Sequence, residues 1–222
     1  LIGPPAKDSI SRAVVVREKH EEGEGLWRFV LADPQGAALP AWSAGAHVDL
    51  IEGGFRRKYS LCGPMSADRA TLQVVVQREA EGRGGSRHFC DTLEVGRALQ
   101  LSGPKNLFKL DESAQRYVLI AGGIGITPML AMADRLRQLG KAYEIHYAGR
   151  SRRHMALLAR LEQDHADRLL LALSIFEHRE RLVRHERDRQ RHRHRHDELG
   201  LDFQSPEHGA QHQNGGENET QA

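Results

Sequence analysis

Cysteine and an excess of charge of either sign are what this sequence lacks most clearly. Two cysteines occur in 222 residues, too few for the four ligands of an iron–sulfur cluster or for the disulfide framework of a small secreted domain. The formal net charge is +2, so composition does not favour nucleic acid or an anionic membrane as a partner. No apolar run approaches the roughly 20 residues of a membrane-spanning helix, and no signal peptide is recognisable. Together these absences predict a soluble cytoplasmic protein without a 2Fe-2S cluster in this chain.

The first half of the chain carries short β-type segments bounded by Gly, Pro and Asp. Apolar residues make up 39% of the whole sequence, which is enough for a hydrophobic core. One helical segment interrupts the strands at 86–96, where Phe89 and Leu93 lie four residues apart and Gly96 is placed to end the helix. We therefore expect a six-stranded antiparallel barrel over residues 1–108. The expected strands are 11–19, 25–33, 46–52, 56–62, 71–79 and 98–104.

Residues 109–175 change period and alternate strands with amphipathic helices. Such an alternation predicts a parallel sheet, here of three strands, whereas a nucleotide-binding sheet usually has roughly five or six. The second half is therefore expected to be an incomplete α/β domain of the nucleotide-binding type. The expected strands are 116–123, 143–149 and 168–174, and the expected helices are 127–140 and 152–165.

The last part of the chain, 176–222, loses this pattern. Residues 177–196 hold eight arginines against four acidic residues, whereas the residues from Asp197 onward hold six acidic residues and no Lys or Arg. A segment with so few large apolar residues is expected to be disordered, and the abrupt loss of pattern is typical of a coding sequence read out of frame. Alternating histidines (His192, His194 and His196) offer metal ligands, but a solvated tail is the favoured interpretation.

The segment 56–64, RRKYSLCGP, ends an expected strand with charged and aromatic residues. Residues two apart share a face of a strand, so Arg57 and Tyr59 point the same way, and Ser60 points to the other side unless the strand bends. A fixed cation, an aromatic ring and a hydroxyl are what a flavin needs for its phosphate, its ring system and its ring nitrogen. An edge strand that carries charges against aggregation explains the same residues equally well.

Two glycine-rich segments precede expected helices. In 82–89, GRGGSRHF, glycines and Ser86 at a helix start would present free N–H groups to an anion, and a flexible hairpin loop is the alternative. In 119–130, LIAGGIGITPML, glycines lie between a strand and a helix, where the backbone can approach a pyrophosphate. Thr127 is expected to cap that helix and Pro128 to occupy its first turn. The spacing differs from the G-x-G-x-x-G dinucleotide fingerprint, so this pattern alone does not identify a dinucleotide site.

Taken together, these three motifs resemble the ferredoxin reductase-like superfamily. RRKYSLCGP, GRGGSRHF and SGPKNLFKL are most similar to the phthalate dioxygenase reductase and vanillate demethylase reductase group, and the resemblance covers about residues 10–174. It implies an oxidoreductase that passes electrons from NADH or NADPH through a flavin to a ferredoxin or a terminal oxygenase. FMN is favoured, and FAD is the alternative. Members of the group also carry a Cys-Gly segment and a C-terminal 2Fe-2S domain; neither is visible here, so the chain is expected to be a truncated reductase whose turnover the resemblance does not guarantee.

The resemblance also implies roles for individual residues. Arg57 would bind the flavin phosphate, and Tyr59 and Ser60 would contact the isoalloxazine, with Ser60 near the reactive ring nitrogen. Ser60 and Thr127 are the expected catalytic residues, in the sense that they orient the reacting rings. No metal ligand is expected. The implied cofactor-binding residues are Arg57, Tyr59, Ser60, Gly84, Gly85 and Ser86 for the flavin, and Gly122, Gly123, Gly125, Thr127, Arg150 and Ser151 for the nicotinamide dinucleotide.

Two other functions stay open from the sequence. A non-catalytic flavin-binding remnant would keep the barrel but lack a working nicotinamide site. A basic interaction module would act through the Arg/His tract on RNA, although the tract has no interleaved aromatic residues for base stacking. Reduction of a bound flavin by NADH would separate an enzyme from the remnant.

Overall fold

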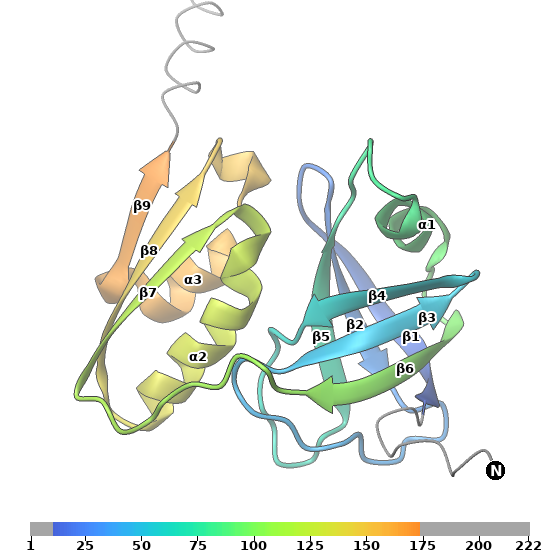
Figure 1. The fold of residues 1–222 in the computed structure, drawn as a ribbon, viewed down its shortest axis with the longest axis horizontal. Coiled ribbons are helices and arrows are strands. Elements are labelled where there is room, and N and C mark those ends of the chain that lie inside the picture. Colours follow the sequence, from blue (N-terminus) through green and yellow to red (C-terminus); the bar gives the residue numbers. More distant parts are fainter. Residues whose placement is uncertain (1–10, 174–222) are drawn as a thin grey trace, which may run out of the picture. The chain divides into compact units, whose positions relative to one another are not determined.

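A computed structural model of the protein describes residues 11–173. It contains a six-stranded antiparallel sheet followed by a three-stranded parallel sheet with helices (Figure 1). The fold class predicted from the sequence is therefore confirmed. The predicted tail at 176–222, with its three alternating histidines, lies outside the described residues, and the predicted domain boundaries stay a prediction.

The six antiparallel strands close into a barrel. The strand order is β4-β3-β6-β1-β2-β5, and a bridge between Leu61 and Val74 joins the β4 end to β5, which closes the sheet on itself. Alternation of buried and exposed residues explains the closure, because the buried side chains of each strand all face one interior. The strands are β1 (Ser11–Gly23), β2 (Leu26–Ala32), β3 (His47–Glu52), β4 (Phe55–Ser60), β5 (Thr71–Gln77) and β6 (Ala98–Lys105).

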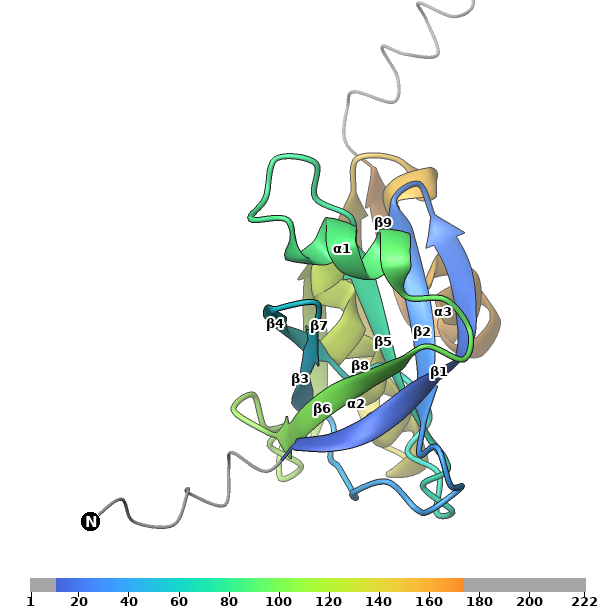
Figure 2. The same ribbon diagram turned by 90° about the vertical axis from the view of Figure 1, so that its right-hand side faces the viewer.

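One helix, α1 (Gly85–Thr92), lies across an end of the barrel (Figure 2). Phe89 and Leu93 are fully buried and join the barrel core, as their spacing predicted. The helix stops at Thr92 rather than near Gly96, because Leu93 already has an extended backbone that turns its side chain into the core. The predicted end of this helix was therefore wrong by about one turn.

The parallel sheet has the order β7-β8-β9, with two helices packed on one of its faces. Residues that alternate along the strands, such as Leu119, Ile145 and Tyr147, are buried under these helices. The elements are β7 (Arg116–Gly122), the 3₁₀ turn Gly123–Gly125, α2 (Ile126–Gln138), β8 (Ala142–Gly149), the 3₁₀ turn Arg152–His154, α3 (Leu158–His165), the 3₁₀ turn Ala166–Arg168 and β9 (Leu169–Leu173).

The helix predicted over 152–165 is broken in the structure. A 3₁₀ turn covers Arg152–His154, and α3 starts only at Leu158, after Leu157 has adopted a left-handed backbone with φ 59°. Met155 and Leu157 are both buried in the core cluster, and a Cβ on Gly149 would lie 2.4 Å from Cγ of Met155. Close packing of Met155 against β8 therefore overrides the helical pattern.

The two sheets belong to one compact unit and share an apolar seam. Leu26, Cys62 and Val75 of the barrel pack in the same buried cluster as Ile126 and Leu130 of α2. A backbone hydrogen bond from the N–H of Glu24 to the carbonyl of Arg153 (2.7 Å) also crosses the seam. Over residues 11–173, no helix combines the length and apolarity needed to cross a membrane.

Candidate functional site

A cavity of about 480 Å³ lies where β4 and β5 meet the starts of α1 and α2, and we call it the smaller cavity. It brings together side chains and backbone from segments that are far apart in the sequence. Predicted site residues from three motifs share this one space, because the strand end, the glycine-rich loop and the helix start all converge there. Those in its lining are Arg57, Tyr59, Ser60, Gly85, Ser86, Gly125 and Thr127.

The cations of strand β4 differ in their partners. Arg56 and Lys58 pair with the buried carboxylate of Asp49 at 3.1 and 2.9 Å, and although burial acts to raise the pKa of Asp49, Lys58 and Arg56 lower it overall. Lys58 and Arg57 both line the smaller cavity, but Arg57 has no carboxylate partner among the described residues, and its Nη1 donates only to the carbonyl of Arg56 (2.8 Å). If the charges of β4 served only to prevent aggregation at a sheet edge, there would be no reason for Arg57 to lack a carboxylate partner. An anion bound in the cavity would explain it.

Arg57 packs directly on the first residue of α1. A Cβ on Gly85 would lie 2.5 Å from Nε of Arg57, so only glycine allows this approach, and Gly84 before it has φ 81°. The first turn of α1 carries no acidic residue. A guanidinium beside the positive end of a helix dipole is repelled unless an anion lies between them. The geometry therefore forms a cradle suited to a small, highly charged anion such as a phosphate.

Tyr59 and Ser60 complete the wall above this cradle. The ring of Tyr59 meets Phe89 of α1 edge-on, with 6.1 Å between ring centroids. Burial raises the pKa of the Tyr59 phenol, so it stays protonated as a hydrogen-bond donor at neutral pH. Ser60 is the last residue of β4, and it lines the same cavity although it alternates with Tyr59.

Ser86 plays a part that the sequence did not predict. Its Oγ accepts a hydrogen bond from the backbone N–H of Glu79 (3.1 Å), and it is the second residue of α1, which begins at Gly85. Arg78, which precedes Glu79 in the chain, forms two hydrogen bonds to Asp91 of α1, at 2.9 and 3.0 Å. The loop between β5 and α1 is thus fastened to the helix at two points.

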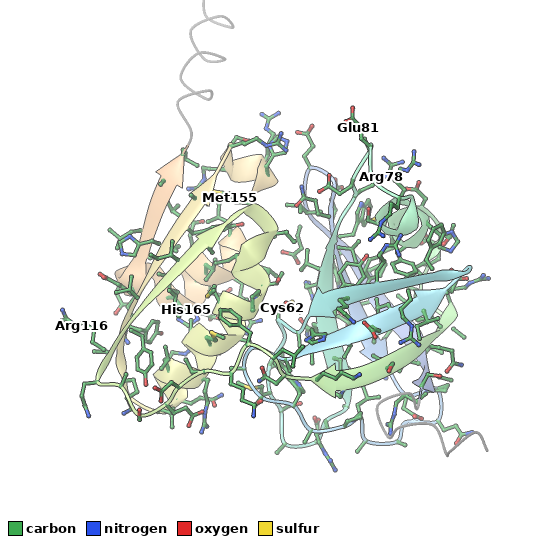
Figure 3. All side chains as sticks on the ribbon, viewed as in Figure 1. Cys62, Arg78, Glu81, Arg116, Met155 and His165 are labelled. Carbon is green, nitrogen blue, oxygen red and sulfur yellow. The ribbon has the colours of Figure 1, made fainter. Side chains whose placement is uncertain are left out.

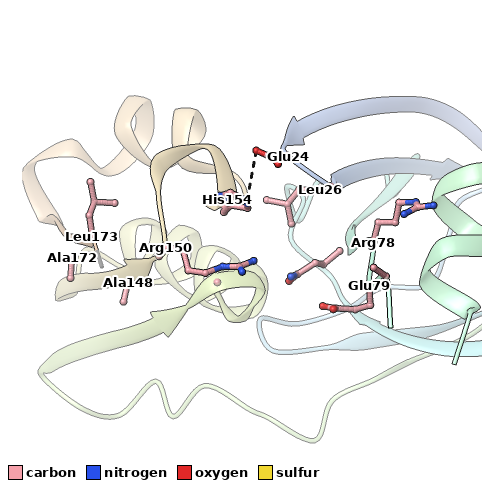
Figure 4. Close-up of a pocket in the computed structure, with 14 residues that line it drawn as sticks. Glu24, Leu26, Arg78, Glu79, Ala148, Arg150, His154, Ala172 and Leu173 are labelled. Atoms are coloured by element: carbon pink, nitrogen blue, oxygen red, sulfur yellow. Dashed lines mark ion pairs between the residues drawn. The ribbon is translucent and has the colours of Figure 1, made fainter. Parts of the chain in front are cut away.

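A larger cavity of about 710 Å³ opens at the carboxyl ends of β8 and β9 (Figure 4). Ligands of open α/β sheets bind at this edge. Arg150 points into the cavity and has no ion-pair partner among residues 11–173, whereas His154 approaches Glu24 at 3.7 Å. Gly123, with φ 51°, belongs to the same lining.

The predicted cap at Thr127 is wrong, and three other predicted site residues lie outside the lining of both cavities. Thr127 does not cap α2: it is the second residue of the helix, and its hydroxyl donates to the carbonyl of Ile124 at 3.0 Å. Ser151 lines neither cavity, and its hydroxyl is hydrogen-bonded to Nδ1 of His154 (2.8 Å). Gly84 and Gly122 also line neither cavity. A Cβ at Gly122 would nevertheless meet nothing within 4 Å, so space stays open beside that turn.

The two cavities adjoin each other. Gln77 and Glu79, at the end of β5, line both of them. The turn Gly123–Gly125 also serves both, since Gly123 lines the larger cavity and Gly125 the smaller. Sequence reasoning missed Gln77 and Glu79, whose only signal is their spacing of two at a strand end. The arrangement can bring two ligands into contact at one boundary.

Comparison with known proteins gives relatives but no matching family model. Phthalate dioxygenase reductase of Burkholderia cepacia is 40% identical over 162 residues, which are 72% of this chain and 50% of that protein. Phenoxybenzoate dioxygenase subunit beta of Ectopseudomonas oleovorans is 45% identical over 147 residues, 66% of this chain and 46% of that one. The chain thus spans about half the length of the curated relatives it matches.

Solved structures agree with this result. A crystal structure of phthalate dioxygenase reductase matches with a TM-score of 0.71 and 36% identity, over 74% of this chain and 52% of that one. An intact type IV self-sufficient cytochrome P450 monooxygenase matches with a TM-score of 0.74 and 47% identity, over 78% of this chain and 23% of that one.

Proposed function

Because the chain belongs to the ferredoxin reductase-like superfamily, with oxygenase reductases as its relatives, we propose that it passes electrons from NADH or NADPH through a bound flavin to a partner. The partner would be a terminal oxygenase or a ferredoxin. The observation that carries this proposal is the boundary between the two cavities, which Gln77 and Glu79 share. A flavin in the smaller cavity and a nicotinamide entering from the larger one would meet there. Transfer needs reacting atoms about 3–3.5 Å apart.

We propose FMN rather than FAD as the flavin. The unpaired Arg57 and the glycine start of α1 converge on one small volume, which suits a terminal phosphate of charge near −2. A flavin supplies chemistry that no side chain here can: it takes two electrons from a nicotinamide and releases them one at a time. The protein's part is to bind, to orient and to exclude water.

The remaining side chains would orient the rings. Tyr59, kept protonated by burial, would lie against the isoalloxazine, and Ser60 would donate a hydrogen bond to its ring nitrogen. Thr127 holds the carbonyl of Ile124 and so fixes the turn at the cavity boundary. No general acid or base is required, because the transferred hydride leaves and arrives without a side-chain proton.

Arg150 is the proposed contact for the adenosine end of the dinucleotide. It is the cation of the larger cavity that has no ion-pair partner among the described residues. If a 2′-phosphate binds there, Arg150→Gln should weaken NADPH about tenfold and leave NADH nearly unchanged. Equal weakening of NADPH and NADH would instead place Arg150 near the pyrophosphate that both nucleotides share. No effect on either nucleotide would mean that Arg150 does not contact them.

The decisive experiment for the flavin site compares Arg57→Gln with Arg56→Gln. Arg57→Gln should weaken FMN binding about 10- to 100-fold, because a charged hydrogen bond to the phosphate is lost, and should leave riboflavin binding unchanged. Arg56→Gln removes a neighbouring charge that is already paired with Asp49, so FMN affinity should stay within about twofold. Mass spectrometry of the released cofactor identifies the flavin.

Anaerobic mixing of the flavin-loaded protein with NADH tests turnover. Bleaching of the flavin absorbance supports the reductase. Absence of bleaching favours the second candidate, a flavin-binding protein without turnover, for which the observation is a described sheet of three strands instead of roughly five or six. A colourless preparation that also refuses added FMN would contradict both.

A further inference from the structure

One arginine side chain forms hydrogen bonds to both halves of the described structure. Arg160 of α3 donates from Nη1 to the backbone carbonyl of Cys62 in the barrel (2.9 Å) and from Nη2 to Oδ2 of Asp134 in α2 (2.6 Å). Its Nε also lies 3.4 Å from Asp164. The side chain is 28% exposed, and Figure 3 shows Cys62 on the side of the barrel that faces α2. Arg160 therefore bonds to a carbonyl that lies 98 residues before it in the sequence and, with the same guanidinium, to α2.

The position of this guanidinium is fixed by a buried polar network. His165, which is fully buried, donates from Nε2 to the other oxygen of Asp134 (3.1 Å) and accepts at Nδ1 from the hydroxyl of Tyr143 (2.8 Å). Both oxygens of Asp134 thus have defined partners, and its side chain is only 8% exposed. A carboxylate held in this way offers Arg160 one orientation.

Both ends of the Arg160 bridge lead to the smaller cavity. Cys62 lies two residues beyond Ser60 on the same segment, and Ser60 lines the cavity. Asp134 belongs to α2, whose first turn contributes Thr127 and Pro128 to the opposite wall. A shift at Arg160 therefore moves one wall against the other. The apolar side chains of the seam make no directional contacts and resist such sliding weakly. The other hydrogen bond described across the seam, from Glu24 to the carbonyl of Arg153, joins segments that do not include Cys62 or α2.

We propose that Arg160 is a positioning residue: it locks α2 and α3 against the end of β4, so that the flavin and nicotinamide cavities stay in register. The effect on hydride transfer rests on the function proposed above. A misplacement of about 1 Å can cost roughly 10²-fold in rate. Arg160 touches neither cavity lining, so its contribution would appear in the rate rather than in binding.

The kinetic test uses the full chain loaded with FMN and three variants. In Arg160→Met the limiting rate of flavin bleaching by NADH should fall about 10- to 100-fold, while the FMN dissociation constant and the half-saturating NADH concentration change less than about threefold. Arg160→Lys should give an intermediate rate, since one ammonium cannot reproduce the forked contact. Arg152→Met, which removes an exposed pair with Glu162 within the same half, should behave as wild type. An unchanged rate in Arg160→Met, or equal losses in rate and in both affinities, would overturn the proposal.

A second readout does not depend on activity. Cys62 and Cys90 are the two cysteines of the chain, and both are buried, but Cys62 belongs to the seam cluster and Cys90 to the barrel core. Labelling with a thiol reagent, located by peptide mass spectrometry, should become about tenfold faster at Cys62 in Arg160→Met and stay unchanged at Cys90. Equal acceleration at both sites would indicate general loosening and defeat the proposal. If wild type is not bleached by NADH, the proposed function fails, while the Cys62 result still decides whether Arg160 locks the seam.

Discussion

The barrel and the parallel sheet bury their apolar residues in different ways. In the barrel, the Leu61–Val74 bridge closes the sheet, and every strand turns one face to a shared interior. In the parallel sheet, helices cover one face only. On the other face Val118, Ile120 and Leu170 are 50%, 70% and 49% exposed in the described structure. The barrel core is built from its own strands, α1 and loop residues such as Leu39 and Ala46, whereas the parallel sheet draws part of its burial from the barrel through the shared seam.

This difference separates the two tasks proposed for the chain. The groups proposed to bind the flavin phosphate, Arg57 and Gly85, both come from the barrel and α1. The nicotinamide pocket needs the ends of β8 and β9 together with Glu24 and Glu79 of the barrel. Damage to the parallel sheet should therefore weaken flavin binding less than it weakens reduction by NADH, because Gly125 and Thr127 line the smaller cavity but do not form the phosphate cradle.

The largest expected effect is on stability, and it comes from comparing two isoleucines of the parallel half. Ile145, in the central strand β8, is fully buried, and Ile120, in β7, lies on the open face. Ile145→Ala should lower the free energy of unfolding by about 2–5 kcal/mol, whereas Ile120→Ala should change it by less than about 0.5 kcal/mol. Urea unfolding followed by circular dichroism and by FMN fluorescence measures both. A large cost at Ile120 would mean that its face is covered in the protein, and would break the comparison.

The sequence predicted the strands well because their signal is local. Alternation along segments such as 71–77 places Leu72, Val74 and Val76 inside the barrel, and these residues are indeed buried. The same period of two placed Arg57 and Tyr59 on one face of β4, and both line the smaller cavity. The local sequence pattern was thus enough to predict both the barrel and the part of the candidate site that lies on a strand.

The features that the sequence did not predict depend on contacts between distant segments. The break before α3 depends on Met155 packing against Gly149, and no helical periodicity reports that contact. Gln77 and Glu79 line both cavities only because the second sheet docks beside the end of β5. The bond from Arg160 to the Cys62 carbonyl has no sequence signal at all, since any residue can supply a carbonyl. Tertiary packing determines these features, so the local sequence pattern could not predict them.

A smaller effect is expected at the glycine that admits Arg57. Gly85→Ala places a methyl group 2.5 Å from Nε of Arg57, so the guanidinium must shift away from the cradle. FMN affinity should fall about tenfold, which is about 1.4 kcal/mol, while the parallel half stays intact. In an Arg57→Gln background the same substitution should cost less than about threefold, because the displaced group is already gone. Fluorescence titration with FMN measures both, and strictly additive losses would show that Gly85 acts independently of Arg57.

The smallest expected effect tests how α1 is tied to the barrel. Glu52 of β3 is 10% exposed, accepts a hydrogen bond from Arg97 (2.7 Å) and pairs with His88 of α1. Arg97 first, and then His88, lower the pKa of Glu52 below its ordinary value of 4.5. The folded state therefore favours the carboxylate, and its stabilisation is complete above about pH 4.5 and lost as pH falls through the lowered pKa.

Glu52→Gln should accordingly reduce the free energy of unfolding by about 1 kcal/mol at pH 7 and by progressively less below about pH 4.5. Glu18→Gln is the matched control, because the pKa of Glu18 is also lowered, chiefly by its bond with His20, but the pair is 50% and 44% exposed. Solvent screening should keep its effect within a few tenths of a kcal/mol. FMN affinity should fall with Glu52→Gln and not with Glu18→Gln, because Glu52, unlike Glu18, contacts the helix whose start forms the phosphate cradle. A pH-independent difference between Glu52→Gln and wild type would show that shape, rather than the carboxylate charge, fixes α1.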